Sequence, residues 1–151
     1  MEKYTEELIN ELQTLKCSDQ LNAFFKNNEQ SIKAPTLPDL LQALLQKNSL
    51  KPAQVIKDSC LDTAYAYKIF SGAKKPSRRK VLALALAFKL TPPETQYLLK
   101  AAGAAELYVR NSWDAALIYA LNKKLSVQQT NCMLCELAEE KLLEEDPDIL
   151  E

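Results

Sequence analysis

The chain has 151 residues, of which 47% are hydrophobic and 26% are charged, and its formal net charge is −1, a composition typical of globular proteins. It contains only 2 glycines, so an all-β fold, a Rossmann domain and a P-loop are disfavoured, because hairpin turns and phosphate-binding loops use glycine at positive φ. It contains no histidine, which excludes histidine-dependent acid–base and nucleophilic catalysis and most zinc enzymes.

Apolar periodicity predicts helices along the whole chain. The first two cover residues 2–16 and 18–28, the second with Ser18 as its N-cap, and the proline-containing stretch 33–38 is the predicted linker after them. No apolar run is long enough to span a membrane, and the polar N-terminus does not match a signal peptide. The later helices are predicted over residues 38–47, 52–59, 63–71, 78–89, 92–102, 112–124 and 126–144.

Particular residues set the boundaries of these helices. Pro52 suits a first helical turn, Asp62 is a good N-cap, and Gly72 suits the position after a helix end. Residues 91–94 and 126–129 match capping boxes, and Ser112 opens the helix between them. The last predicted helix carries an apolar stripe of Val127, Leu134, Ala138 and Leu142, and an acidic tail follows it.

The four cysteines give no sign of a site. Cys132 and Cys135 form a C-x-x-C pair within a helix, without histidine or a second pair, so buried or half-buried thiols are expected rather than a zinc or redox centre. No paired carboxylates or other nucleophile constellation stands out. The sequence therefore predicts no catalytic residue, no metal and no cofactor.

The middle of the chain has a distinctive layout. Two short helices, 52–59 and 63–71, are joined by the tight turn 60–62, and a basic loop, 72–77, then leads to an apolar helix. Two short helices with such a turn form a helix-turn-helix unit.

Residues 50–72 resemble, without a gap, the five-helix Cro/C1-type (XRE-like) DNA-binding domain of bacterial and phage repressors. The sequence GAKKPS at 72–77 is similar to the G-x-(K/R)-x-P-S segment that follows the recognition helix of that family. The inward apolar positions that match are Leu50, Val55, Ile56, Leu61, Ala66 and Ile69. The resemblance covers about residues 37–103 and implies an all-α fold, in which a five-helix helix-turn-helix core carries additional N- and C-terminal helices.

Charge is unevenly distributed along the chain. Residues 51–90 contain nine cations against Asp58 and Asp62, a net charge of +7, whereas residues 136–151 contain eight acids against Lys141, a net charge of −7. Cations concentrated on a helix-turn-helix segment favour phosphate binding over an ordinary solvated face.

The resemblance also implies the site residues. On the recognition helix, Thr63, Ala64 and Lys68 match the base-reading positions, and Tyr67 is expected to reach sugar or phosphate, although packing on a neighbouring helix is the other reading. Tyr65 is expected to pack rather than to bind. Phosphate contacts are expected from Lys74, Lys75, Arg78 and Arg79, within the basic stretch 74–80.

The implied organisation is an N-terminal helical extension (1–34), a DNA-binding domain (36–103) and a C-terminal helical region with an acidic tail (104–151). The expected function is that of a cytoplasmic, non-enzymatic, sequence-specific transcriptional regulator. Its expected partner is double-stranded DNA, with a homodimer or a protein partner at the N- or C-terminal helices left open, and no membrane.

A protein-interaction adaptor, built on a degenerate helix-turn-helix domain, is the alternative. The resembling family usually has glycine where this chain has Cys60, and often a phosphate-contacting glutamine where it has Pro52. That family also usually has alanine where this chain has Ile56. Both readings predict the same helices and differ in what the outer face of residues 63–71 contacts.

Overall fold

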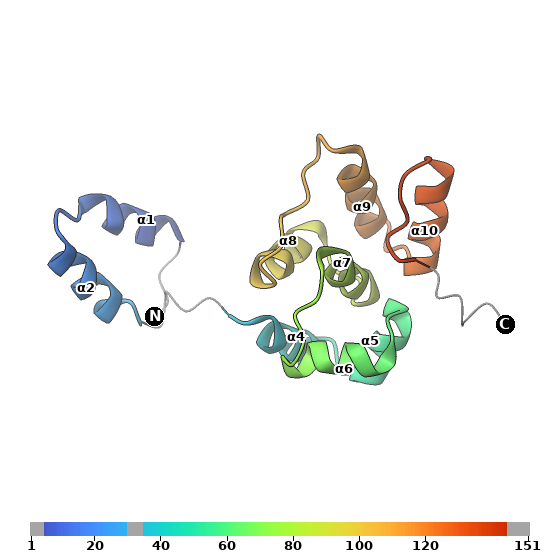
Figure 1. Cartoon of the computed structure of the whole chain (residues 1–151), viewed down its shortest axis with the longest axis horizontal. Coiled ribbons are helices and arrows are strands. Elements are labelled where there is room, and N and C mark those ends of the chain that lie inside the picture. The colour runs from blue at the N-terminus through green and yellow to red at the C-terminus, as the bar shows by residue number, and fades with distance from the viewer. Residues whose placement is uncertain (1–4, 30–34, 145–151) are drawn as a thin grey trace. The chain divides into compact units, whose positions relative to one another are not determined.

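The structure is a computed structural model that describes residues 5–29 and 35–144. Within those ranges it contains nine α-helices and no strand, which confirms the all-α prediction (Figure 1). The chain divides into two compact units, Met1–Pro35 and Thr36–Glu151. The division falls in the predicted linker. The predicted regions 36–103 and 104–151 belong to one unit.

The first unit is a pair of helices, α1 (Thr5–Thr14) and α2 (Ser18–Asn27). Phe24 is buried there, and its ring meets Phe25 edge to face, with 5.9 Å between centroids. The buried amide of Asn28 donates to Phe24 O (2.9 Å) and to Glu11 Oε2 (3.2 Å). The N-cap of α2 is Cys17 rather than the predicted Ser18, and Cys17 makes no side-chain capping bond.

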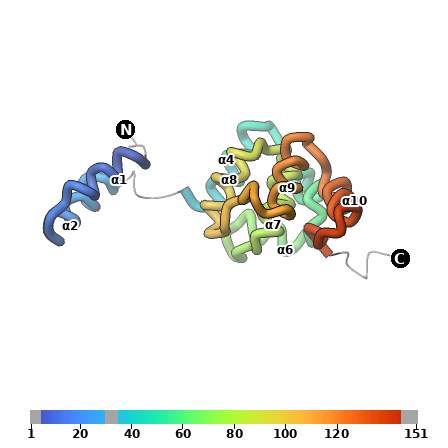
Figure 2. The backbone as a smooth tube through the Cα atoms, turned by 90° about the horizontal axis from the view of Figure 1, so that it is seen from above, coloured from blue at the N-terminus to red at the C-terminus, as the bar shows by residue number. Residues whose placement is uncertain are grey.

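The second unit is built around α7 (Arg78–Ala87), in which every residue from Val81 to Ala87 is buried. A helix that is apolar on all sides must be covered on all sides. It packs against α5, α8, α9 and α10, and the two views in Figure 1 and Figure 2 both show it among the other helices of this unit. The surrounding helices are α4 (Leu37–Lys47), α5 (Pro52–Ser59), α6 (Thr63–Ser71), α8 (Pro92–Ala101), α9 (Ser112–Asn122) and α10 (Val127–Glu136).

Most of these helices begin with a side-chain cap. Asp62 accepts the N–H of Tyr65 at 3.0 Å, and Thr91 and Ser126 form the two predicted capping boxes. The cap of α9 is Asn111, one residue before the predicted Ser112, and it accepts the N–H of Asp114 at 3.0 Å. Each such cap stabilises the folded state by about 1 kcal/mol.

In this chain with only 2 glycines, several helices end at a non-glycine residue in the left-handed conformation. Non-glycine residues with φ between 52° and 61° stand at the helix ends: Ser49, Cys60, Lys89, Lys124 and Ala138. At four of these ends the next residue's N–H bonds to a carbonyl five residues back, as in a Schellman motif. These bonds are Leu50 to Leu45 (2.9 Å), Leu90 to Ala85 (3.1 Å), Leu125 to Ala120 (3.0 Å) and Glu139 to Leu134 (2.8 Å).

Replacing exposed Ser49, at φ 52°, with glycine is expected to raise the free energy of unfolding by about 0.5–1 kcal/mol. Glycine removes the Cβ that is crowded at positive φ, which outweighs the extra freedom of the unfolded chain. Urea unfolding followed by circular dichroism measures the change. Ser49→Ala keeps the Cβ and should bring no gain, so a glycine variant less stable than the alanine variant would contradict this account.

The prediction of one helix over 126–144 is wrong. The helix α10 ends at Glu136, because Ala138 adopts φ 57° and the chain turns back. Residues 139–144, here called the C-terminal strap, then run beside α7, α9 and α10. Leu142 of the strap is buried in the core, and the Asn131 side chain accepts the N–H of Leu142 at 2.9 Å. Leu142, which was expected on a helical stripe, therefore enters the core from the strap.

Candidate nucleic-acid interface

The pair α5–α6 has the connectivity of a helix-turn-helix. Its turn, residues 60–62, places Cys60 at φ 61° and Asp62 as the cap of α6. The buried Ser59 side chain stabilises this turn. Its hydroxyl donates to Ile56 O at 2.6 Å and accepts the Leu61 N–H at 3.3 Å. Cys60 therefore takes the left-handed conformation that glycine would adopt more easily.

The inward faces of both helices are apolar and closed. Val55 and Ile56 on α5, and Ala66 and Ile69 on α6, are each no more than 2% exposed. This fixes the orientation of α6, so that its opposite face points to solvent. The predicted base-reading residues lie on that opposite face.

Four predicted site residues, Thr63, Ala64, Tyr67 and Lys68, are exposed together along α6. Tyr67 is 45% exposed, so the structure does not give it the packing role that the sequence left open. In the described part of the chain, no side chain bonds to those of Thr63, Tyr67 or Lys68. Among the described residues, none covers these four side chains, which lie open to solvent.

The basic loop 72–77 returns to the end of α6. Gly72 adopts φ 87°, and the N–H of Lys74 donates to Lys68 O at 3.1 Å, which holds the two lysines next to each other. Lys74 and Lys75 are both exposed. The Lys75 side chain lies over Gly103, where a Cβ would come within 3.1 Å of its Nζ.

Arg78, for which the sequence predicts a phosphate contact, makes several hydrogen bonds within the protein. Its Nη1 and Nη2 donate to the two carboxylate oxygens of Asp114, at 3.0 and 2.8 Å. Its Nε donates to Ala105 O at 2.8 Å and its Nη2 to Glu106 O at 3.0 Å. Two of these donor contacts go to Asp114 on α9 and two to the segment before α9, so this guanidinium is engaged within the protein.

The buried end of that ion pair is Asp114, whose side chain is 9% exposed. Burial alone raises the pKa of Asp114, but the hydrogen bonds from Arg78 and from the Tyr108 N–H, together with the charge of Arg78, outweigh it and lower the pKa. Asp114 therefore carries its negative charge at neutral pH and fixes the loop between α8 and α9.

Arg79 is also occupied. Its Nη1 donates to Lys141 O at 2.6 Å and its Nη2 pairs with Glu140, both in the strap. The Trp113 ring lies beneath, 5.2 Å from the Arg79 guanidinium carbon, and its indole N–H donates to Glu140 O at 2.8 Å. Arg79 thus contacts the strap in this structure, and its phosphate contact stays a prediction.

Lys80 takes a place at the edge of the α6 face. Its Nζ lies 3.8 Å from the centroid of the Tyr65 ring, and Tyr65 is half-buried against the core. The Tyr65 hydroxyl lies 3.5 Å from Lys75 O. Tyr65 thus links α6 to the basic loop and to the start of α7 instead of facing solvent.

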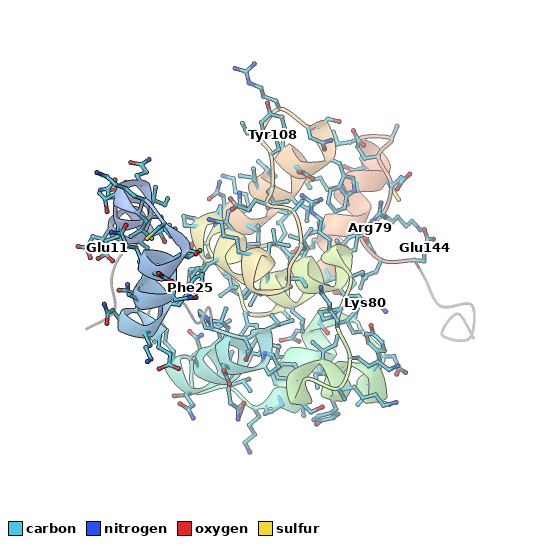
Figure 3. All side chains as sticks on the ribbon, turned by 60° about the vertical axis from the view of Figure 1, so that its left-hand side comes forward. Glu11, Phe25, Arg79, Lys80, Tyr108 and Glu144 are labelled. Carbon is cyan, nitrogen blue, oxygen red and sulfur yellow. The ribbon has the colours of Figure 1, made fainter. Side chains whose placement is uncertain are left out.

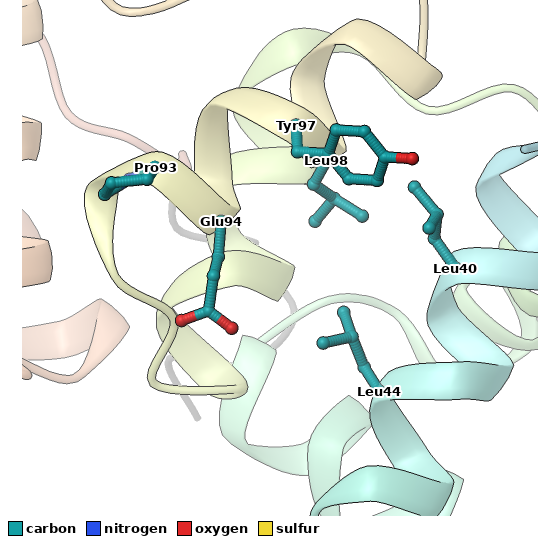
Figure 4. A pocket seen from close by; sticks show the side chains of 6 residues that line it. All are labelled: Leu40, Leu44, Pro93, Glu94, Tyr97 and Leu98. Atoms are coloured by element: carbon teal, nitrogen blue, oxygen red, sulfur yellow. The ribbon is translucent and has the colours of Figure 1, made fainter. Parts of the chain in front are cut away.

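A separate apolar surface lies between α4 and α8. A pocket of about 340 Å³ is lined by the side chains that Figure 4 labels, Leu40, Leu44, Pro93, Glu94, Tyr97 and Leu98. Tyr97 is 52% exposed. The Glu94 carboxylate closes the capping box of α8, and its hydrogen bonds to Thr91 lower its pKa.

The cysteines do not gather into a site. All four are free and exposed, which corrects the expectation of buried or half-buried thiols. Across residues 5–29 and 35–144, no cluster of three or more cysteine, histidine or acidic side chains is arranged to hold a metal ion.

Comparisons of the chain with family models, with curated proteins and with solved structures find no match. None of the helices in the described ranges has the length and apolar character that crossing a membrane requires.

Proposed function

We propose that this protein is a sequence-specific, DNA-binding transcriptional regulator that inserts α6 into the major groove. The observation that carries the proposal is the outer face of α6, beside Lys74 of the basic loop. There Thr63, Tyr67 and Lys68 are exposed, and their side chains bond to no residue that the structure describes. An exposed helix with base-edge donors, flanked by cations, matches the chemistry of groove recognition. The resemblance to Cro/C1-type domains supports the same orientation of the helix.

Each residue then has a distinct role. Lys68 donates to guanine O6 and N7, and the methyl groups of Thr63 and Ala64 contact the thymine methyl. Tyr67 reaches sugar or phosphate. Lys74 and Lys75 bind phosphate and set register, without reading sequence. Arg78 and Arg79 serve the scaffold by holding the α8–α9 loop and the strap.

Binding of the full chain to a random-sequence duplex at rising salt tests the proposal. If Lys74 and Lys75 each neutralise one phosphate, log K falls against log salt with a slope of about −1.8 per chain. Fluorescence anisotropy of a labelled duplex measures the slope. Absence of binding even at about 50 mM salt would overturn the proposal.

A protein-interaction adaptor is the second candidate, and the pocket between α4 and α8 favours it. The half-exposed Leu40 and Leu44 and the exposed Tyr97 form an apolar surface suited to a partner side chain. The salt series separates the two functions, because an adaptor of this kind requires no affinity for duplex DNA.

A further inference from the structure

The strap ends beside the first turn of α6. A cavity of about 570 Å³ separates the first turn of α6 and the first turn of α7 from residues 142–144. Figure 3 shows Arg79 and Glu144 at the same edge of the unit, with Lys80 close by. The residues that line this cavity include Asp62, Thr63, Tyr65, Lys80, Leu143 and Glu144. The chain therefore leaves the described region next to the base-reading end of α6.

Several independent contacts fix the strap against α7 and α9. The Ser112 hydroxyl donates to Glu139 Oε1 at 2.6 Å, Trp113 donates to Glu140 O at 2.8 Å, and Arg79 donates to Lys141 O at 2.6 Å. Buried Leu142 anchors it in the core. These contacts hold the strap up to Leu142, two residues before Glu144.

The residues that follow are strongly acidic. The segment 144–151 contains five acids and no base, and its residues 145–151 lie outside the described residues. Seven residues span up to about 23–25 Å when extended, whereas a nine-residue helix such as α6 is about 14 Å long. The acidic segment is thus long enough to reach any part of the α6 face.

The α6 face, which the acidic segment can reach, is positively charged. Lys68, Lys74, Lys75 and Lys80 form no ion pair with any carboxylate in the described part of the chain. The neighbouring carboxylates are engaged elsewhere, since Asp62 caps α6 and Asp58 accepts from Gln54 at 3.1 Å. In the proposed complex, Lys74 and Lys75 would meet phosphate and Lys68 a base edge.

We propose that the acidic segment 144–151 occupies the lysine-rich face of α6 in the absence of DNA and competes with the phosphate backbone. This inference rests on the proposed function. A tethered segment acts at an effective concentration in the millimolar range, so that even a weak contact lowers the apparent affinity for DNA. Both interactions are ionic, and salt therefore reduces the competition.

The test neutralises four acids in the full chain, by Glu145→Gln, Asp146→Asn, Asp148→Asn and Glu151→Gln. The control neutralises four acids of the first unit, by Glu6→Gln, Glu7→Gln, Asp19→Asn and Glu29→Gln, so that both variants gain the same net charge. Two readouts are taken: affinity for a random duplex at about 50 and 200 mM salt, and backbone amide chemical shifts of Lys68 and Lys80 without DNA.

The expected result is about 10-fold tighter DNA binding by the tail variant than by the control at low salt, with a smaller difference at high salt. The amides of Lys68 and Lys80 should shift in the tail variant only. Equal DNA affinity of the two variants with unshifted amides would overturn the inference and leave the proposed function standing. If no variant binds DNA, the proposed function fails, and the amide shifts alone decide whether the segment occupies the α6 face.

Discussion

Replacing Lys68 and Lys74 together with glutamate is expected to weaken binding to a random duplex at least about 100-fold at low salt. The double variant removes two phosphate or base contacts and places two like charges against the DNA backbone. The slope of log K against log salt should become shallower by about 0.9, for the phosphate contact that Lys74 loses. Because both side chains are exposed, the helical circular-dichroism signal should not change.

Lys16→Glu with Lys26→Glu is the matched control, because it changes the net charge equally with exposed lysines of the first unit. It should bind DNA far more tightly than the Lys68/Lys74 variant. Equal losses in the two double variants would mean that total charge, and not the α6 face, governs binding. Arg79 is unsuitable for this test, because its substitution would release the strap.

The second large effect concerns stability. Replacing Asp114 with alanine is expected to lower the free energy of unfolding by about 3 kcal/mol, because it strands the Arg78 guanidinium and removes the acceptor of the Tyr108 N–H. Urea unfolding followed by circular dichroism measures the loss. A change below about 0.5 kcal/mol would mean that the ion pair contributes no more than an exposed one.

The same carboxylate predicts a pH dependence. Its pKa in the folded protein is lowered, so its contribution is complete above the unfolded value of about 3.9 and is lost as pH falls through the folded value. Stability of the unmodified protein should therefore decline in acid below about pH 4. Asp114→Asn has no proton to take up there and should decline less steeply, whereas parallel acid limbs would contradict the assignment.

The helices around the site could be predicted because local chemistry determines their ends. Pro52 in a first turn, the Asp62 cap and Gly72 at positive φ give α5 and α6 the bounds that the sequence indicates. The all-round apolar pattern of residues 81–87 likewise identifies α7 as the buried helix. These signals lie within a few residues of the feature they specify.

The end of α10 could not be predicted in this way. Ala138 favours helix by propensity, yet it adopts φ 57° and reverses the chain. The reversal is stabilised by contacts that are distant in sequence, among them Leu142 in the core and the Asn131 side chain. An apolar stripe continuing to Leu142 is compatible with a helix and with a strap, and periodicity does not distinguish the two.

In the candidate site, too, local sequence predicts some features, whereas others depend on contacts that are distant in sequence. The outward face of α6 follows from helical periodicity, but the partners of Arg78 and Arg79 lie 36 and 61 residues away in the chain. Counting charge along residues 51–90 treats both arginines as free cations. The available signals were Asp114, the one acid in an otherwise apolar helix, and the adjacent Trp113.

The central claim, that the outer face of α6 contacts DNA, is tested most directly by lysine labelling of the unmodified full chain with and without a random duplex. An amine-reactive reagent modifies exposed lysines, and mass spectrometry gives the rate at each position. We predict that DNA slows modification of Lys68, Lys74 and Lys75 at least several-fold and leaves the exposed Lys16 and Lys123 unchanged. If Lys68 and Lys74 react at the same rate in a complex shown to contain bound DNA, α6 does not form the interface.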